Sequence, residues 1–236
     1  MWSRVEDIKV KERLERVQER IRQAAQACHR PETDIRLVAV SKTMPVEIVK
    51  EAIETGMTDF GENYIQEARE KITTLSAYPV TWHYIGHLQS NKAKYAVRMF
   101  DLIHSVDSLK LAKALDKYAK NIDKVQDILV QVNVAKEDSK SGVYGEDTLQ
   151  LVRETARLEN IAVKGLMTMP PYFNAPDKAR PFFAALRHLR DQIKNENIPN
   201  IAMEELSMGM TGDFEVAIAE GATMVRVGTA IFGERH

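Results

Sequence analysis

The sequence predicts an α/β fold in which a long N-terminal helix precedes a single (β/α)8 (TIM) barrel. Short apolar, β-branched runs alternate with helix-patterned stretches, which indicates a parallel sheet covered by helices. Eight such units fit within the 236 residues of the chain, and closed barrels of this kind usually have about 250. An open doubly wound sheet is the alternative, because short strands are easily miscounted. Since no linker or shift in composition divides the chain, we expect one domain over residues 1–236.

The first predicted element is an amphipathic helix over residues 3–28. Apolar side chains recur there at helical spacing, and Arg, Lys, Glu and Gln fill the other face. We expect this N-terminal region, residues 1–30, to pack on the barrel, because most amphipathic helices face a core. A helix that binds a partner is the alternative.

Strands and helices then alternate along the rest of the chain. The expected strands are residues 36–41, 59–61, 82–86, 102–106, 128–134, 163–168, 205–208 and 224–228. The expected helices are residues 46–55, 65–75, 92–98, 109–120, 149–158, 177–195 and 214–220. Ser108 and Asp213 are the expected N-caps, and Gly56 and Gly221 stand where C-cap glycines belong.

Composition argues against several classes of protein. The chain has 33 Lys+Arg and 34 Asp+Glu, so its formal net charge of −1 gives no overall reason to expect nucleic acid or acidic membranes as partners. A single cysteine, Cys28, cannot form an intramolecular disulfide. The N-terminal residues have no apolar signal-peptide core, and no apolar run approaches a membrane span of about 18 residues. We therefore expect a soluble, cytoplasmic protein.

The barrel prediction also indicates where function lies, because active sites of such barrels form at the C-terminal ends of the strands. Lys42 follows the first strand in VAVSKTMP. A desolvated pocket disfavours the ammonium form, and the free amine attacks carbonyls. Lys42 could therefore form a Schiff base with a substrate or a pyridoxal cofactor. A lysine whose head reaches water at the barrel rim is the alternative.

The last two strands carry the features of a phosphate site, which barrels of this kind place after strands 7 and 8. In MVRVGTAIFG, the two-residue period turns Arg226 into the barrel, where it needs an anion or another acceptor. A structural ion pair is the alternative. Gly228 and Thr229 open the next turn, where backbone N–H groups can approach a phosphate. The small, hydroxyl-bearing loop SMGMTG, which begins at Ser207, precedes a helix. A helix N-terminus with an adjacent glycine loop can bind phosphate through its free N–H groups.

Polar residues also follow the second and third strands. Asn63 could hydrogen-bond a bound ring, with helix capping as the alternative. His83 and His87 have no nearby cysteine and no HExxH spacing, so we expect no metal site and interpret them as satisfied or pocket-lining histidines. The motifs GxSxG, GxGxxG and GxxxxGK[ST] do not occur, and Cys28 lies in the first helix, so hydrolase, dinucleotide and P-loop functions are not expected.

A lysine after strand 1, an arginine in strand 8 and two phosphate-type loops together suggest pyridoxal phosphate (PLP). Over nearly its whole length the chain resembles the pyridoxal phosphate homeostasis proteins, which are related to the barrel domain of alanine racemase. The segments that carry this resemblance are VAVSKTMP, DFGENYIQEAREK, WHYIGHLQSNKAK, HSVDS, VNVAKEDSKSG, GLMTMPP and ELSMGMTGDFEVAIAEGATMVRVGTAIFGER.

The resemblance implies a role for each candidate residue. Lys42 would hold the cofactor as an internal aldimine, Arg226 would face the pyridine nitrogen, and Asn63 would line the ring. The cofactor phosphate would be bound by Ser207 and the backbone around Met208, Gly228 and Thr229. Because arginine is always cationic, it would disfavour protonation of the ring nitrogen and make the cofactor a poorer electron sink.

The resemblance also implies a carrier of PLP that maintains intracellular vitamin B6 and amino-acid balance, with no agreed enzymatic reaction. We expect a monomer whose partners are PLP-dependent apo-enzymes or proteins of the B6 pathway. The alternative is a PLP-dependent amino-acid racemase. Alanine racemases add a β-rich domain that supplies a tyrosine base, and this sequence ends at His236 soon after the eighth strand. A scaffold that acts through the N-terminal helix is a third possibility.

Overall fold

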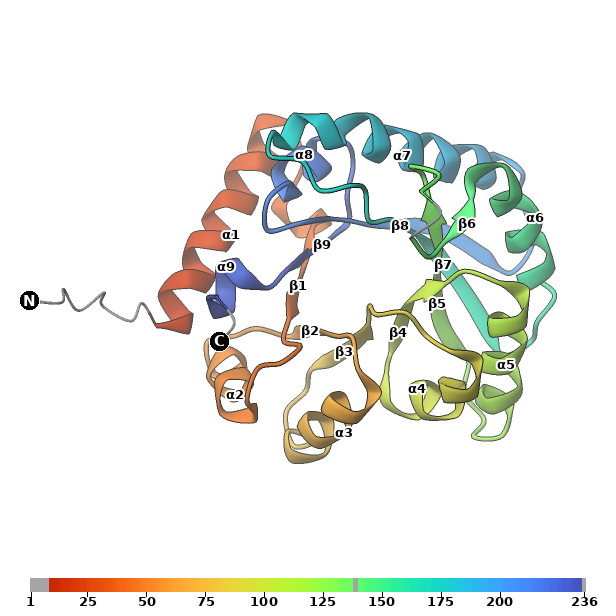
Figure 1. The fold of residues 1–236 in the computed structure, drawn as a ribbon, viewed down its shortest axis with the longest axis horizontal. Helices are drawn as coiled ribbons and strands as arrows, with labels where there is room; N and C mark the ends of the chain where they lie inside the picture. The colour runs from red at the N-terminus through yellow and green to blue at the C-terminus, as the bar shows by residue number, and fades with distance from the viewer. Residues whose placement is uncertain (1–8, 138–139, 235–236) are drawn as a thin grey trace, which may run out of the picture.

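The computed structural model describes residues 9–137 and 140–234, and within them eight parallel strands close into a barrel (Figure 1). The barrel strands are β1 (Arg36–Val40), β2 (Asp59–Glu62), β3 (Thr81–Tyr84), β4 (Leu102–Val106), β5 (Gln126–Asn133), β7 (Ile161–Met167), β8 (Ile201–Met210) and β9 (Met224–Val227). Their order is β4-β3-β2-β1-β9-β8-β7-β5, and a β4–β5 pairing completes the ring. The predicted (β/α)8 barrel is confirmed.

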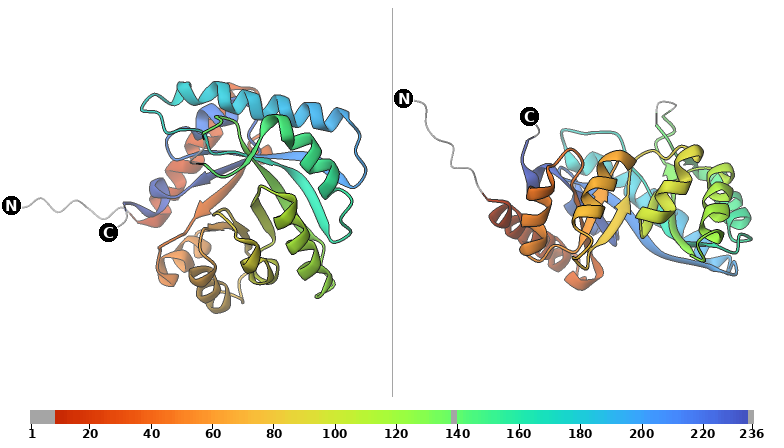
Figure 2. Two further views of the ribbon diagram at one scale, coloured as in Figure 1. Left: turned by 45° about the vertical axis from the view of Figure 1, so that its right-hand side comes forward. Right: turned by 90° about the horizontal axis from the view of Figure 1, so that it is seen from below.

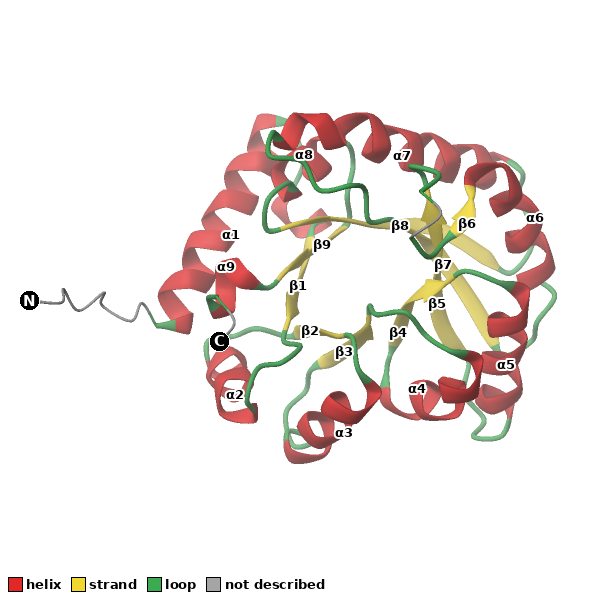
Figure 3. Cartoon of the chain, viewed as in Figure 1, coloured by secondary structure: helices red, strands yellow, loops and turns green. Residues whose placement is uncertain are grey.

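Helices surround the strands on the outside of the barrel (Figures 2 and 3). They are α1 (Val10–Ala27), α2 (Val46–Glu54), α3 (Ile65–Thr74), α4 (Ala93–Met99), α5 (Leu109–Lys120), α6 (Gly145–Thr155), α7 (Arg180–Asn195), α8 (Phe214–Ala219) and α9 (Thr229–Phe232). The short α-helix α9 and the short strand β6 (Val143–Tyr144), which pairs with β5, were not predicted. A segment of two or four residues is too short to show a hydrophobic period.

The N-terminal helix α1 packs against the barrel layer. It begins at Val10, because Lys9 has extended backbone, and residues 3–8 of the expected helix lie outside the described residues. Buried side chains recur every three or four residues along it, at Val10, Leu14, Val17, Ile21 and Ala25. They place α1 against α8 and α9, beside the strands that close the ring (Figure 1). Among the described residues, no helix is long and apolar enough to cross a bilayer.

The predicted helix ends are partly confirmed. Ser108 caps α5, since its Oγ accepts the backbone N–H of Leu111 at 3.4 Å. Asp213 is the N-cap residue of α8, as expected, but its side chain makes no cap bond to the helix, because its carboxylate accepts the N–H of Met210 at 2.6 Å. The Asp213 carboxylate therefore stabilises the tight turn between β8 and α8 instead of the first turn of the helix. Both expected C-cap glycines have left-handed backbone, with φ of +97° at Gly56 and +96° at Gly221.

The core has two parts. The larger one lies between strands and helices, and a small inner layer of Leu102, Leu129, Met167 and Met224 lies in a separate cluster. Several polar side chains in the strands are also fully buried, among them His83, His104, Ser207 and Arg226. Buried polar groups are costly unless they are hydrogen-bonded, so their partners matter for the site.

Candidate functional site

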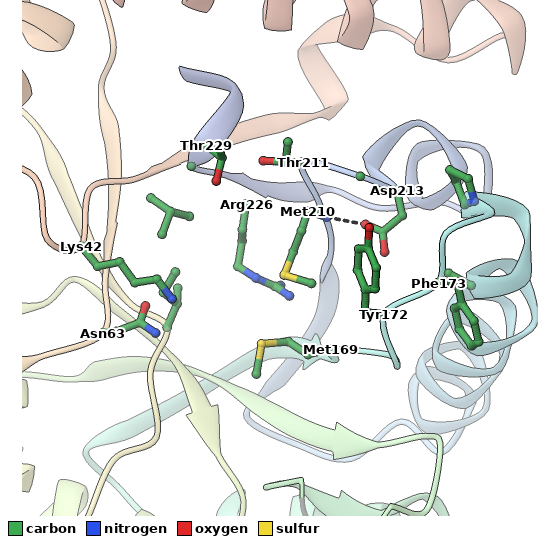
Figure 4. A pocket seen from close by; sticks show the side chains of 16 residues that line it. Lys42, Asn63, Met169, Tyr172, Phe173, Met210, Thr211, Asp213, Arg226 and Thr229 are labelled. Carbon is green, nitrogen blue, oxygen red and sulfur yellow. Dashed lines mark hydrogen bonds between the residues drawn. The ribbon is translucent and has the colours of Figure 1, made fainter. Parts of the chain in front are cut away.

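A cavity of about 260 Å³ opens at the C-terminal ends of the barrel strands (Figure 4). Five of the seven predicted site residues line it: Lys42, Asn63, Arg226, Gly228 and Thr229. Lys42 and Asn63 lie on one side and Tyr172 and Asp213 on the other, with Arg226 and Met210 between them (Figure 4). Side chains from opposite ends of the sequence therefore meet in one space.

Lys42 follows the end of β1 at a sharp turn of the chain. The next residue, Thr43, has φ of +65°, a left-handed conformation that β-branched side chains rarely adopt. Its N–H donates to the Glu67 carboxylate at 2.8 Å, which holds the turn. Strained backbone of this kind persists only where the surroundings enforce it, so the position of Lys42 is fixed by its neighbours.

A compact buried network, which we call the lysine-side pair, lies beneath Lys42. Lys71 Nζ donates to Glu62 Oε1 at 2.7 Å and to the carbonyl of Ser41 at 2.6 Å. Ser41 Oγ donates to the same carboxylate oxygen at 2.6 Å. Burial raises the pKa of Glu62, and the hydrogen bonds from Lys71 and Ser41 oppose that rise. The network holds both the backbone and the hydroxyl of the residue that precedes Lys42.

Sequence reasoning missed this network. Lys71 occupies a buried position of α3 in register with Ile65 and Ala68. A lysine at an apolar position of a helix, with no neighbour in sequence to explain it, is the signal that could have revealed a buried ion pair. Its partner Glu62 is the last residue of β2, directly before Asn63.

Asn63 is held at the cavity by a close approach of two loops. A Cβ on Gly86 would lie 2.4 Å from the carbonyl oxygen of Asn63, so only glycine lets the segments after β2 and β3 meet. Asn63 Oδ1 is buried and has no hydrogen-bond partner among the described residues. Such an acceptor costs about 1–3 kcal/mol, and a donor on a bound molecule would recover that cost.

Arg226 points into the barrel, as the two-residue period predicts, and only 3% of it is exposed. Its Nη1 donates to Ser207 Oγ and its Nη2 donates to the Thr168 carbonyl at 2.8 Å. Burial lowers the pKa of Arg226 to about 10. The group is therefore still cationic at neutral pH and presents a positive charge at the cavity floor.

Ser207 and Met208 are the two predicted site residues that do not line the cavity. Both are fully buried in β8. The Ser207 hydroxyl accepts from Arg226 and lies 2.9 Å from His104 Nδ1, so its bonds are made inside the barrel. From the same segment, Met210, Thr211 and Gly212 reach the cavity instead.

This arrangement suits a flat, anionic molecule that carries a carbonyl. It offers a primary amine, a buried cation, an unpartnered acceptor and a glycine-bearing turn at Gly228 and Thr229. Apolar walls come from Val40, Ile85 and Met169. Among the described residues, no three His, Cys, Asp or Glu side chains are grouped as a metal site requires.

Comparison with known proteins identifies the family of this chain. Residues 13–236 match the family described as the alanine racemase N-terminal domain. A pyridoxal phosphate homeostasis protein of Aquifex aeolicus is 46% identical over 224 residues, which cover 95% of this chain and 97% of that protein. The chain belongs to the pyridoxal phosphate homeostasis protein family. The predicted resemblance is thereby confirmed.

Solved structures agree with this family assignment. PipY of Synechococcus elongatus, solved with PLP bound, has a TM-score of 0.82 at 35% identity and covers 95% of this chain and 100% of its own. An alanine racemase of Clostridium difficile has a TM-score of 0.75 at 15% identity, and the match covers 96% of this chain and 57% of the racemase. At that identity the likeness shows the barrel fold alone.

Proposed function

We propose that this chain binds PLP in the cavity and maintains the intracellular supply of that cofactor, and with it vitamin B6 and amino-acid balance. The observation that carries the proposal is the meeting of Lys42, Asn63 and Arg226 at one cavity. Membership of the family and the PLP-bound PipY structure support it. When bound, the cofactor supplies an aldehyde that condenses with a primary amine with loss of water.

The residues of the chain divide the work of binding. Lys42 supplies the amine, and the lysine-side pair fixes the backbone from which it projects. Asn63 Oδ1 would accept a hydrogen bond from the bound molecule, and Arg226 would hold a positive charge beside it at the cavity floor.

The proposed phosphate contacts come from the backbone at the ends of the last two strands. Gly228 and Thr229 line the cavity and supply N–H groups there. We assign Ser207 and Met208 a part only through the β8 backbone, which carries the following residues into the cavity, because both side chains are buried elsewhere.

Borohydride trapping tests the proposal. After incubation with PLP, reduction and digestion, we expect a pyridoxyl mass increment on the peptide that contains Lys42. Lys42→Ala should abolish it. Lys50→Ala is the matched control, because Lys50 is half-exposed on α2 and pairs with Glu54 at 3.6 Å; it should label like the wild type. An unlabelled Lys42 in the wild-type protein would refute the proposal.

The cellular part of the proposal is that the protein works as a cytoplasmic monomer that hands PLP to apo-enzymes. Wild-type protein that has been incubated with PLP and then freed of excess cofactor should activate a PLP-dependent apo-enzyme. Lys42→Ala protein treated in the same way, at the same concentration, should activate it more slowly. Incubation with amino acids in deuterium oxide tests the racemase alternative. Rapid, Lys42-dependent exchange at Cα would favour an enzyme over a carrier.

A further inference from the structure

A second buried network crosses the barrel interior beneath Arg226, and we call it the arginine-side relay. Ser207 Oγ accepts from Arg226 and lies 2.9 Å from His104 Nδ1. His104 Nε2 lies 2.9 Å from His83 Nδ1, and His83 Nε2 lies 3.1 Å from Asp59 Oδ1. From Arg226 to Asp59 the network uses one residue from each of five strands, β9, β8, β4, β3 and β2, and the carboxylate is the first residue of β2. The relay therefore runs from the cavity floor to the opposite end of the barrel.

Hydrogen-bond chemistry gives the relay a direction. A carboxylate only accepts, so His83 carries its proton on Nε2 and leaves Nδ1 to accept. His104 Nε2 must then donate, and its Nδ1 accepts the proton of the Ser207 hydroxyl. Since Ser207 Oγ in turn accepts from Arg226, every donor points from Arg226 toward Asp59.

The reverse direction is disfavoured by the same count of donors. It would need His83 protonated on both nitrogens and His104 to donate to Ser207. Ser207 Oγ would then accept hydrogen bonds from both Arg226 and His104. Neither of these two neighbours could accept the buried proton of the Ser207 hydroxyl. Unsatisfied buried donors are costly, so the first arrangement is favoured.

Charge and burial agree with this arrangement. His83 and His104 are fully buried, and burial holds the pKa of His104 well below its usual value, so that it is neutral. Burial also acts to raise the pKa of Asp59, but hydrogen bonds with His83 and Thr58 outweigh this and lower it. Asp59 faces Arg36 of β1 at 3.8 Å, and Arg36 lies 3.5 Å from Glu205 of β8. The hydrogen bonds thus join the Arg226 cation to the Asp59 carboxylate through Ser207, His104 and His83.

We propose that His104, together with His83 and Ser207, is a positioning relay that holds the Arg226 guanidinium at the cavity floor by tying it to the Asp59 carboxylate. Its consequence for PLP rests on the proposed function, whereas the relay itself does not. Arg226 keeps one N–H group directed at Ser207 and another at Thr168. The remainder of this planar group therefore faces the cavity in one orientation.

The first test needs neither cofactor nor variant. In ¹⁵N-histidine-labelled apo-protein at pH 7.5, assigned through backbone connectivity, we expect His83 and His104 each to carry one proton, on Nε2. A proton on Nδ1 of either ring, or two protons on one ring, would overturn the relay. Because PLP is absent from this measurement, its result is independent of whether the proposed function holds.

The second test measures the dissociation constant for PLP and the visible spectrum of the loaded protein. We expect His104→Phe to weaken PLP binding about tenfold, corresponding to a lost hydrogen-bonded anchor. His104→Gln, which keeps one donor and one acceptor, should retain most of the affinity. Asp59→Asn, at the far end of the barrel, should weaken binding about threefold and shift the pH at which the spectrum changes.

Ser105→Ala is the matched control. Ser105 neighbours His104 on β4 and is equally buried, but its hydroxyl has no hydrogen-bond partner among the described residues. We expect it to bind PLP like the wild type. If Ser105→Ala weakened binding as much as His104→Phe, or if Asp59→Asn had no effect, the relay would have no positioning role. If wild-type protein bound no PLP, the proposed function would fail while the NMR result still decided the relay.

Discussion

Two buried polar networks support the same cavity in different ways. In the lysine-side pair, Lys71 and Glu62 touch directly at 2.7 Å, and their charges cancel within the barrel wall. In the arginine-side relay, the charges of Arg226 and Asp59 are separated by Ser207, His104 and His83. The direct pair fixes a backbone segment and adds little net charge near Lys42. The relay fixes a side chain and leaves its full positive charge facing the cavity.

Breaking the direct pair should have the largest effect. Lys71→Met leaves the Glu62 carboxylate buried without its cation, and such breaks cost about 3–5 kcal/mol. Urea unfolding should show this loss at pH 7.5. The double variant Glu62→Leu/Lys71→Met should recover more than half of it, because two apolar groups leave no uncompensated charge. Equal losses in the single and double variants would mean that the charge is not the cause.

Breaking the relay should have a smaller effect that depends on pH. His104→Phe removes one of the two hydrogen-bond partners of His83 and one of the two of Ser207, so we expect a loss of about 2–4 kcal/mol at pH 7.5. The folded pKa of His104 is lowered by burial, so below about pH 6.5 the unfolded chain takes up a proton that the folded protein does not. From this residue alone, the free energy of unfolding of the wild type should therefore decrease by about 1.4 kcal/mol for each unit by which the pH drops below 6.5.

His104→Phe removes that uptake, so its stability should fall less steeply than that of the wild type between pH 6.5 and 5. Urea unfolding at half-unit pH steps measures both slopes. Asp59 acts in a lower range, because its depressed pKa contributes stability that is lost only as the pH falls below about 3.9 and through its folded value. Parallel slopes for the two proteins would show that His104 titrates normally in the fold.

Gly86→Ala tests how the lysine side meets the cavity. Its Cβ would lie 2.4 Å from the Asn63 carbonyl oxygen and 2.8 Å from the Asn63 Cα, so the backbone must shift. We expect a loss of about 1–2 kcal/mol and weaker PLP binding, measured by fluorescence titration. Gly145→Ala is the control, since a Cβ there meets nothing within 4 Å. Unchanged PLP binding in Gly86→Ala would remove Asn63 from the site.

The smallest effect is expected beside Lys42. Thr43→Gly relieves the left-handed strain of a β-branched residue and partly offsets that gain through a more flexible unfolded chain, so we expect a gain of about 0.5 kcal/mol. Thr55→Gly is the matched control, because Thr55 has an ordinary φ of −88° and its replacement should destabilise the protein. Thermal unfolding compares the two, and a loss of stability in Thr43→Gly would show that the turn is unstrained.

The contrast between the networks also explains what sequence reasoning could find. Lys42 and Arg226 were predicted because each has a local sign, a place directly after a strand or a two-residue period within one. The members of the relay, from Arg226 to Asp59, come from five strands, and no spacing in the sequence connects His83 to His104 or Asp59. The loop that begins at Ser207 was predicted to bind phosphate, and the family resemblance implied that Ser207 itself does so. No sequence pattern indicated that the Ser207 hydroxyl lies 2.9 Å from a histidine that only barrel closure brings near. Local sequence pattern predicts which way a side chain points, whereas closure of the barrel determines which other side chains it contacts.

The pairing of β1 with β9, which places Val38 opposite Arg226, has a consequence for the order in which the molecule is assembled. These are the first and last barrel strands of the described chain, so their contact is among the most distant in sequence, and such contacts form late and slowly. Lys42 and Arg226 stand on either side of this seam. During synthesis, an emerging chain cannot bring Lys42 and Arg226 to one cavity until β9 has left the ribosome. Under the proposed function, the cofactor can therefore be bound only after the barrel is complete.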